Sequence, residues 1–558
     1  MLELIDYLVP LPVVLPLLAA GLRLALGPRW LALQRGISVA TLSIVLLVAL
    51  ALLVGAETRG PLVVQVGGWP APIGISLVAD RLSALLLLIS VAITLAVLVY
   101  SIGQGMVDEE GAAPLAIYHP TYLILVAGVA QAFLAGDLFN IYVGFEVLLT
   151  ASYVLLTLGG TSARLRAGAT YVVVSLLSSM VFLIAVAAIY AATGTLNLAQ
   201  LSGRLAELPP QLQLVLHILL LTGFAIKAAV FPLAAWLPDS YPTAPAPVTA
   251  VFAGLLTKVG VYAMVRTQTL LFPDGQLDTL LLVAALATML VGILGAVAQT
   301  DIKRLLSFTL VSHIGFMVFG LGVGSAHGLS AAVFYVVHHI TVQTSLFLVA
   351  GLIERRGGTT SMRLLGGLAG LSPLLGILFF IPAMNLAGIP PLSGFLGKLG
   401  LLQAGVAAGT PLAYILVTGS VVTSLLTLYA MARVWNYVFW RSPTVGMVAT
   451  PGTVLESPGE QALTSAYGID TTVGPASRRA VGASAATMGG QAIMTTTHLP
   501  RTMTGATLTL VALGLALTVL AGPLSAYCER TASEALDSGI YVEAVGAADG
   551  GGDEEGEP

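Results

Sequence analysis

The 558-residue chain has little charge: only 9% of its residues are Asp, Glu, Lys or Arg, whereas 57% are hydrophobic. Soluble domains carry about 25% charged residues, so this composition excludes an ordinary soluble protein and predicts one that folds in lipid. The single cysteine, Cys528, excludes a disulfide framework or a thiolate metal site within one chain. Motifs for zinc, nucleotide or dinucleotide binding are also lacking. We therefore expect no cofactor, no metal, no enzyme activity and no nucleic-acid partner.

Long apolar runs fill most of the sequence instead. A helix needs about 20 mostly apolar residues to cross a bilayer. On that measure we predict an all-α polytopic membrane protein, with the N-terminus retained as a first span rather than removed as a signal peptide. The fourteen predicted spans lie near residues 4–26, 35–55, 79–103, 117–136, 138–158, 167–193, 210–236, 245–267, 275–299, 302–322, 328–353, 370–402, 411–440 and 503–524.

Basic residues set the predicted orientation of these spans. Fifteen Lys and Arg residues fall on one side of the predicted membrane and five on the other. Because short cytoplasmic loops are rich in Lys and Arg, the first side is assigned to the cytoplasm and both termini to the outside of a bacterial cytoplasmic membrane. Residues 442–502, rich in Thr, Gly, Ala and Ser, are expected to form a flexible cytoplasmic loop, and the acidic end of the chain a flexible tail.

Two of the predicted spans are interrupted by proline and glycine. Five prolines follow Lys227 within residues 232–247, and Pro382, Pro390 and Pro391 precede Lys398 in the twelfth span. Broken helices in lipid are tolerated where the freed backbone groups face protein or a water-filled cavity. Since five spans separate the two breaks, spans four to eight and nine to thirteen would be inverted copies, a pattern that points to a transport site near the membrane midplane. Two unrelated kinked helices are the alternative.

This pattern divides the chain into five predicted segments. They are an N-terminal three-helix segment (1–110), a first five-helix repeat (111–270), a second five-helix repeat (271–441), the cytoplasmic loop (442–502) and a last helix with its acidic extracytoplasmic tail (503–558).

Lysine is rare and is placed selectively. The chain has nineteen arginines but only four lysines, and Lys227, Lys258 and Lys398 lie inside predicted spans. Arginine keeps its proton, whereas burial drives lysine toward its neutral form, so a site that gains and loses a proton requires lysine. The non-functional alternative is that each lysine extends along the lipid so that its ammonium reaches the membrane interface. Lys258 lies about 20 Å into its span at 1.5 Å per residue, which is too deep for its ammonium to reach the interface. We therefore interpret these lysines as functional.

Other ionisable residues extend the set. Glu146 is the carboxylate well inside a span and is expected to pair with Lys227, unless it is merely structural. His338 and His339 lie mid-span and suit proton relay near neutral pH. Adjacent helical residues point about 100 degrees apart, so we expect one of these two imidazoles to face the pathway and the other to pack. Further candidates are His313, which could equally be a packing residue, and Asp137, between the fourth and fifth spans.

At this level of detail the sequence resembles a known family. The stretches "IKAAVFPLAAWLPDSYPTAPAPVTAVFAGLLTKVGVYAMVR", "QTDIKRLLSFTLVSHIGFM" and "HHITVQTSLFLVAG" resemble the antiporter-like subunits shared by respiratory complex I and the Mrp-type sodium/proton antiporters. The resemblance implies fourteen helices with two inverted five-helix repeats and discontinuous seventh and twelfth helices. It also implies proton-pathway roles for Glu146, Lys227, Lys258 and Lys398. Gln343 departs from the family pattern, because many relatives carry lysine there.

Within the family, "WLPDSYPTAPAPVTA" and "SGIYVEAV" favour the D-type branch of the Mrp antiporter subunits. The predicted function is proton translocation within a multisubunit monovalent cation (sodium)/proton antiporter, with the other subunits, protons, sodium ions and the bilayer as partners. One alternative is the pumping module of a redox-driven, complex I-like oxidoreductase. The other is a structural subunit that transports nothing.

Overall fold

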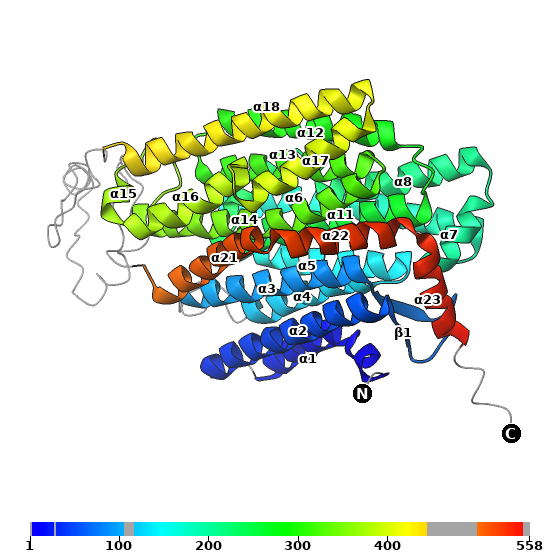
Figure 1. Cartoon of the computed structure of the whole chain (residues 1–558). Coiled ribbons are helices and arrows are strands. Elements are labelled where there is room, and N and C mark those ends of the chain that lie inside the picture. Colours follow the sequence, from blue (N-terminus) through cyan, green and yellow to red (C-terminus); the bar gives the residue numbers. More distant parts are fainter. Residues whose placement is uncertain (1–2, 27–29, 105–116, 443–498, 551–558) are drawn as a thin grey trace.

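The computed structural model describes residues 3–26, 30–104, 117–442 and 499–550. Within these ranges the all-α polytopic prediction is confirmed (Figure 1): eleven helical segments are long and apolar enough to cross a membrane, and three shorter apolar helices accompany them. The shorter ones are Leu11–Leu26, Tyr118–Leu134 and Pro373–Ala387. Together the two groups match the fourteen predicted spans, and the chain is a multi-pass membrane protein.

The elements follow one another in this order: η1 (Glu3–Leu8), α1 (Leu11–Leu26), α2 (Leu31–Arg59), β1 (Leu62–Val66), β2 (Ile75–Ala79), α3 (Arg81–Gln104), α4 (Tyr118–Leu134), α5 (Leu138–Thr157), α6 (Ser162–Thr193), α7 (Leu198–Ala206), α8 (Pro210–Ala228), α9 (Trp236–Ser240), η4 (Tyr241–Thr243), α10 (Ala246–Val251), η5 (Phe252–Leu256), α11 (Thr257–Arg266), η6 (Thr267–Leu271), α12 (Asp278–Ala298), α13 (Ile302–Gly322), α14 (Ala326–Gly357), α15 (Leu368–Leu371), α16 (Pro373–Ala387), α17 (Ser393–Ala408), α18 (Pro411–Val434), η7 (Trp435–Trp440), α21 (Arg501–Val519), α22 (Ala521–Leu536) and α23 (Ser538–Gly550).

A small β-hairpin, which the sequence analysis did not predict, joins α2 to α3. β1 and β2 pair antiparallel, with Leu62 opposite Ala79 and Val66 opposite Ile75. Both η1 and α23 pack on β1, so the two described ends of the chain lie at this end of the bundle. We call it the hairpin end. Termini on the same side agree with an even number of spans.

Two matching caps mark the inverted repeats. Asp137 precedes α5 and accepts a hydrogen bond from the amide of the third helical residue, and Asp301 does the same for α13. Each aspartate also forms an isolated β-bridge sixty residues further along the chain, Asp137 with Asn197 and Asp301 with Ser361. The same local device therefore begins the second helix of each repeat.

These two caps lie at opposite ends of the bundle. Ala135, beside the first cap, bridges Leu77 of the hairpin. The second cap adjoins the end of α14, where Arg355 donates a hydrogen bond to the carbonyl of Gln104, the last residue of α3. Since α3 begins next to β2, Gln104 marks the end opposite the hairpin. The two repeats enter the membrane from opposite sides, as the five-span offset predicted.

Both predicted discontinuities are confirmed. Helix α8 ends at Ala228, and Ala229 has a left-handed backbone with φ of 59° before the chain turns into α9. Helix α16 ends at Ala387, and Gly388, with φ of 87°, turns the chain toward α17. Prolines remove amide donors that would continue each helix, so both breaks follow from the sequence directly.

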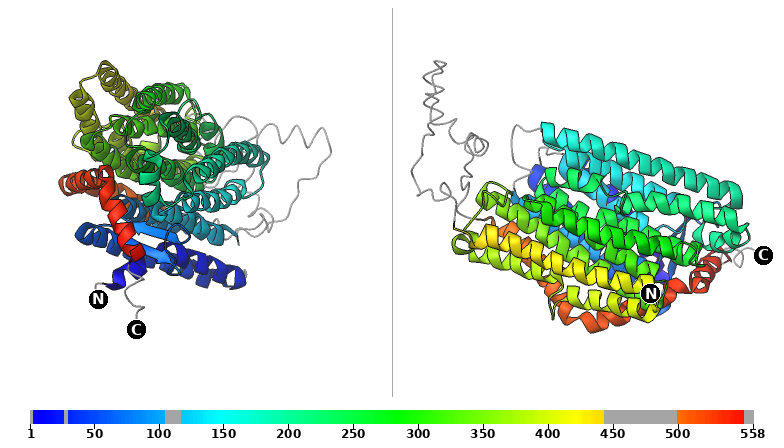
Figure 2. Two further views of the ribbon diagram at one scale, coloured as in Figure 1. Left: turned by 90° about the vertical axis from the view of Figure 1, so that its right-hand side faces the viewer. Right: turned by 90° about the horizontal axis from the view of Figure 1, so that it is seen from above.

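The core of the bundle is α14 together with the run from α10 to η6, whose most apolar stretches are buried on all sides. Viewed roughly along the helices, the green-to-yellow helices lie on one side and the blue N-terminal helices on the other, with the red C-terminal helices crossing between them (Figure 2).

The predicted cytoplasmic loop lies almost entirely outside the described residues. The predicted flexible tail is helical as far as Gly550, and residues 551–558 lie outside the description.

Candidate functional site

The best-connected part of the predicted pathway joins helices α5, α6 and α8. Ser179 of α6 donates a hydrogen bond to Glu146 Oε1 on α5, and Lys227 Nζ on α8 donates to Ser179 Oγ over 3.0 Å. The sequence predicted a direct Glu–Lys pair. In the structure the two charged groups are instead joined through the serine hydroxyl, and no direct ion pair between them is formed.

Apolar and hydroxyl-bearing side chains surround this bridge. Lys227 is buried, and its Nζ lies 4.9 Å from the centre of the Phe145 ring. A cavity of about 20 Å³, lined by Ser175, Ser178 and Trp236 among others, adjoins the ammonium. A cavity needs at least about 10–15 Å³ to hold a water molecule, so this one has room for about one. Lys227 and Ser179 are thus buried, whereas Glu146 at the other end of the bridge is partly exposed.

Lys258 is held differently. It is completely buried in α11, and its Nζ donates to the carbonyl of Ala253 over 2.5 Å. Ala253 belongs to η5, a stretch of π-helix just before Lys258 in the same span. Wider helical turns of this kind are frequent at functional sites. No carboxylate forms an ion pair with Lys258 within the described ranges.

Three histidines form one buried cluster within the second repeat. The rings of His313 on α13 and His339 on α14 have centroids 5.3 Å apart. His313 Nδ1 is 2.6 Å from the hydroxyl of Tyr335, and His338 Nδ1 is 3.0 Å from the hydroxyl of Ser393 on α17. Both ring nitrogens of His339 and Nε2 of His338 are buried without a partner.

The two adjacent histidines point in different directions on α14, and the expectation that one faces the pathway while the other packs stays a prediction. Helix α14 is surrounded by protein, so both directions lead inward: His338 turns toward α17 and His339 toward α13. Helix α14 also packs against η5, the segment that immediately precedes Lys258. The cluster thus lies between the lysine of α11 and the broken helix that carries Lys398.

Lys398 occupies the second helix break. Its Nζ donates to the carbonyls of Leu386 and Ala387, both over 3.0 Å, and lies 5.0 Å from the centre of the Phe316 ring. These carbonyls are at the C-terminus of α16, where the helix dipole favours a cation. The carbonyl end of one half-helix therefore holds an ammonium carried by the other half.

The secondary candidates have structural partners. Asp137 caps α5, accepts two hydrogen bonds from Asn140, and lies outside the spans; burial raises the pKa of its carboxyl, while those bonds favour the charged form. Gln343 Nε2 donates to the carbonyl of Leu306 over 2.7 Å, and its Oε1 is buried without a partner. Neither side chain contacts a lysine of the row directly in the interactions described.

We predict that Gly394→Ala damages the second break. A Cβ at Gly394 would lie 2.8 Å from His338 Cε1 and would collide with the carbonyl of Asn385. The Gly394 amide donates a hydrogen bond to Asn385 Oδ1 over 2.8 Å. Moving the two segments apart to make room for the Cβ would break this hydrogen bond at the start of α17. The expected result is at least a severalfold loss of folded subunit in membranes, measured by immunoblot after detergent extraction. Gly505→Ala, where a Cβ meets nothing within 4 Å, is the control; equal abundance of the two variants would contradict the prediction.

Two features were missed in the sequence. Arg266, at the end of the predicted span 245–267, is buried in α11 and pairs with the equally buried Asp80. Ser179, which bridges Glu146 and Lys227, could not be singled out, because a serine in an apolar helix looks like any small packing residue. Only its neighbours in space show this contact.

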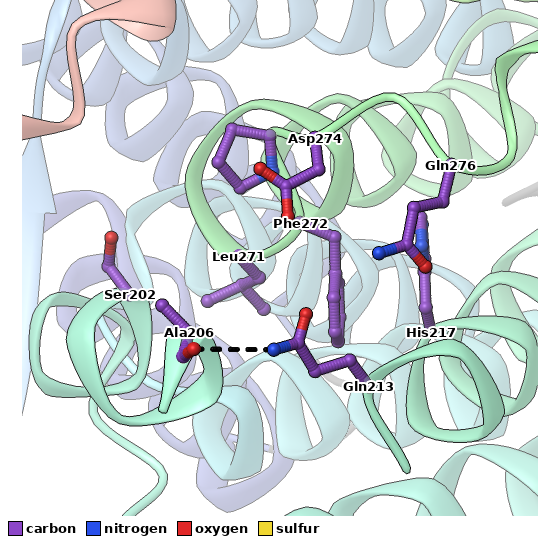
Figure 3. Close-up of a pocket in the computed structure, with 9 residues that line it drawn as sticks. Ser202, Ala206, Gln213, His217, Leu271, Phe272, Asp274 and Gln276 are labelled. Atoms are coloured by element: carbon purple, nitrogen blue, oxygen red, sulfur yellow. Dashed lines mark hydrogen bonds between the residues drawn. The ribbon is translucent and has the colours of Figure 1, made fainter. Parts of the chain in front are cut away.

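A second cavity, of about 50 Å³, lies between α7, the start of α8 and the segment that follows η6. The His217 ring stacks parallel to Phe272 with centroids 4.3 Å apart, and Gln213 reaches across to the carbonyl of Ala206 (Figure 3). His217 precedes Lys227 by ten residues on α8, or about 15 Å at 1.5 Å per residue. This cavity is therefore separate from the row of buried lysines.

Comparison with known proteins places these features in a family. The family model described as "NADH:quinone oxidoreductase/Mrp antiporter, TM" matches residues 135–427. The D subunit of the Na(+)/H(+) antiporter of Alkalihalophilus pseudofirmus is 42% identical over 436 residues, which cover 78% of this chain and 87% of that protein. The corresponding D subunit of Bacillus subtilis is 39% identical over 77% of this chain and 86% of its own length.

Solved structures agree. A chain of the Mrp complex from Dietzia sp. DQ12-45-1b superposes with a TM-score of 0.84 and 34% identity, over 97% of this chain and 99% of that one. A chain of the membrane-bound sulfane sulfur reductase, an archaeal respiratory membrane complex, gives a TM-score of 0.77 over 97% and 100% of the two chains. At 24% identity the second match shows the shared fold alone.

Proposed function

The chain belongs to the family of transmembrane subunits shared by NADH:quinone oxidoreductases and Mrp antiporters, within which its relatives are antiporter D subunits, and from this premise we propose that it carries protons through a multisubunit sodium/proton antiporter. The proposed pathway is the row Glu146, Lys227, Lys258, the histidine cluster and Lys398. Other subunits of the complex, protons, sodium ions and lipid are its partners.

The observation that carries the proposal is the hydrogen-bonded bridge from Glu146 through Ser179 to Lys227. A charged lysine in a low-dielectric interior is stabilised by a nearby carboxylate, and protonation of that carboxylate removes the support. The lysine then passes its own proton onward. A structural ion pair has no need of an intervening group that both donates and accepts a hydrogen bond.

The two helix breaks support a pathway with two half-channels. Lys227 lies at the end of α8 beside the first break, and Lys398 lies against the open carbonyl end of α16 at the second. The caps of the two repeats lie at opposite ends of the bundle, so the breaks are related by inversion. We propose that the repeats open toward opposite faces and that Lys258 and the histidines connect them.

We place both termini, and with them the hairpin end, outside the cytoplasm of a bacterial cell. This orientation puts Lys303, Arg304 and Arg355 at the cytoplasmic surface, in keeping with the excess of basic residues in cytoplasmic loops.

No sodium cage is recognised in this row. Sodium is therefore proposed to cross in another subunit or at an interface.

The proposal is tested by sodium-driven proton movement in inverted vesicles that contain the whole complex. Glu146→Ala and Lys227→Ala, compared at equal complex abundance, are expected to lower the rate at least about tenfold, since positioned proton-transfer groups contribute about 10²–10⁴-fold. The matched controls are Lys303→Ala and Glu354→Ala, which break a direct 2.6 Å ion pair outside the row. These two are expected to keep near wild-type rates.

The outcomes separate the alternatives. Wild-type transport in the Glu146 and Lys227 variants would mean that the bridge is structural and that protons cross elsewhere in the complex. Proton movement that requires a quinone or another redox substrate, and that ignores a sodium gradient, would favour the redox-driven module instead.

A further inference from the structure

The bridging residue Ser179 occupies a position that requires a group able to donate to one neighbour and to accept from the other. It is 4% exposed, and its Oγ donates to the Glu146 carboxylate while it accepts from the Lys227 ammonium over 3.0 Å. A serine hydroxyl has one donor and two acceptor sites, a lysine ammonium has donors only, and a carboxylate has acceptors only. Ser179 is thus oriented by its two partners, with its proton on the side of the carboxylate.

We propose that Ser179 is a pathway residue that passes the proton between Lys227 and Glu146; this inference rests on the proposed function. In the transfer, the Nζ–H bond of Lys227 breaks as that proton binds Ser179 Oγ. The original Oγ–H bond breaks as its proton binds Glu146 Oε1. Lysine and glutamate become neutral, and serine keeps one proton. Reversal of the two hydrogen bonds returns the proton.

The surroundings leave few other routes between the two groups. The Phe145 ring covers Lys227 from one side, and the adjoining cavity holds about one water. Phe182, fully buried on the same helix as Ser179, stacks edge-on with Phe145 at 6.1 Å. Among the described side chains, Ser179 is the one that hydrogen-bonds to both Lys227 and Glu146.

The neighbouring serine supplies a matched control. Ser178 is also on α6 and buried, but its hydroxyl donates to the carbonyl of Gly223, a backbone group that does not exchange protons in this way. Loss of this hydroxyl removes one hydrogen bond between α6 and α8 and leaves the Glu146–Ser179–Lys227 bridge in place. A general effect of losing a serine on α6 would appear in both variants.

The experiment compares Ser179→Thr with Ser179→Val in vesicles holding the assembled complex at equal abundance. Threonine and valine have the same shape and differ in the hydroxyl, and valine also blocks a replacement water. We expect Ser179→Thr to transport at least about tenfold faster than Ser179→Val, given the contribution of a positioned proton-transfer group. Ser178→Ala is expected to remain near the wild-type rate.

Equal rates for the threonine and valine variants would overturn the inference, as would equal losses in Ser178→Ala and Ser179→Val. Glu146→Ala is measured in the same vesicles. If that variant is inactive while the two Ser179 variants match each other, the serine inference fails and the proposed function stands. If Glu146→Ala also transports normally, the proposed function fails as well.

Discussion

Lys258→Arg is expected to lower sodium-driven proton movement roughly a hundredfold, although it keeps the positive charge. The effect lies within the range that a positioned proton-transfer group contributes. Lys258 is completely buried and, among the ion pairs described, has no carboxylate partner; its ammonium binds the Ala253 carbonyl. A lysine in such a place can release its proton, whereas a guanidinium stays charged at any accessible pH. The row would then be interrupted at its centre.

The measurement uses vesicles holding equal amounts of assembled complex, with Lys303→Arg as the matched control. Lys303 is the fourth lysine of the chain and forms a direct ion pair with Glu354 outside the row. The same chemical change there should leave transport near the wild-type rate. Rapid transport by Lys258→Arg would show that this position needs only a positive charge. Protons would then have to reach the histidine cluster without passing through the side chain of residue 258.

Asp80→Ala is expected to destabilise the subunit by about 3–5 kcal/mol, the usual effect of removing one partner of a buried ion pair. Asp80 pairs with Arg266, and both side chains are 5% exposed or less. Arg266 also donates to the Tyr262 hydroxyl over 3.1 Å, but that neutral group cannot balance the charge. Without Asp80 the guanidinium remains buried, and the contact between the start of α3 and the end of α11 is lost.

The effect is measured as the temperature at which half of the detergent-extracted complex aggregates, together with the amount of subunit in membranes. Asp239→Ala is the control, because its ion pair with Arg304 is largely exposed and such pairs contribute about 0–1 kcal/mol. A second variant, Asp80→Leu with Arg266→Met, removes both charges and should recover much of the stability. If Asp80→Ala and Asp239→Ala are equally stable, the buried pair does not hold these elements together.

The sequence located the buried ionisable residues of the proposed pathway but not the hydrogen bonds that connect them. Lys227, Lys258 and Lys398 were identified because a charge inside an apolar run is costly and therefore conspicuous. The link through Ser179 could not be found in this way, since serine is common in membrane helices. The buried ion pair of Arg266 was missed as well, because its carboxylate partner, Asp80, is remote in sequence.

The adjacent histidines show a second limit. Helical geometry alone predicts that His338 and His339 point in different directions, and the structure agrees. Whether the second direction leads to lipid or to protein depends on what surrounds α14. That helix is buried on all sides, so both imidazoles lie in the interior, and which of them faces the pathway stays a prediction.

By itself, the sequence determined the number of spans, the two helix breaks and the placement of the lysines. These properties depend on local physics: the hydropathy of about 20 residues, the missing amide of proline, and the cost of a charge in lipid. Tertiary structure alone decided that Ser179 separates Glu146 from Lys227, that Asp80 neutralises Arg266, and that a β-hairpin closes one end. Those features join residues that are distant in the chain, and their energy exists only after the helices have packed.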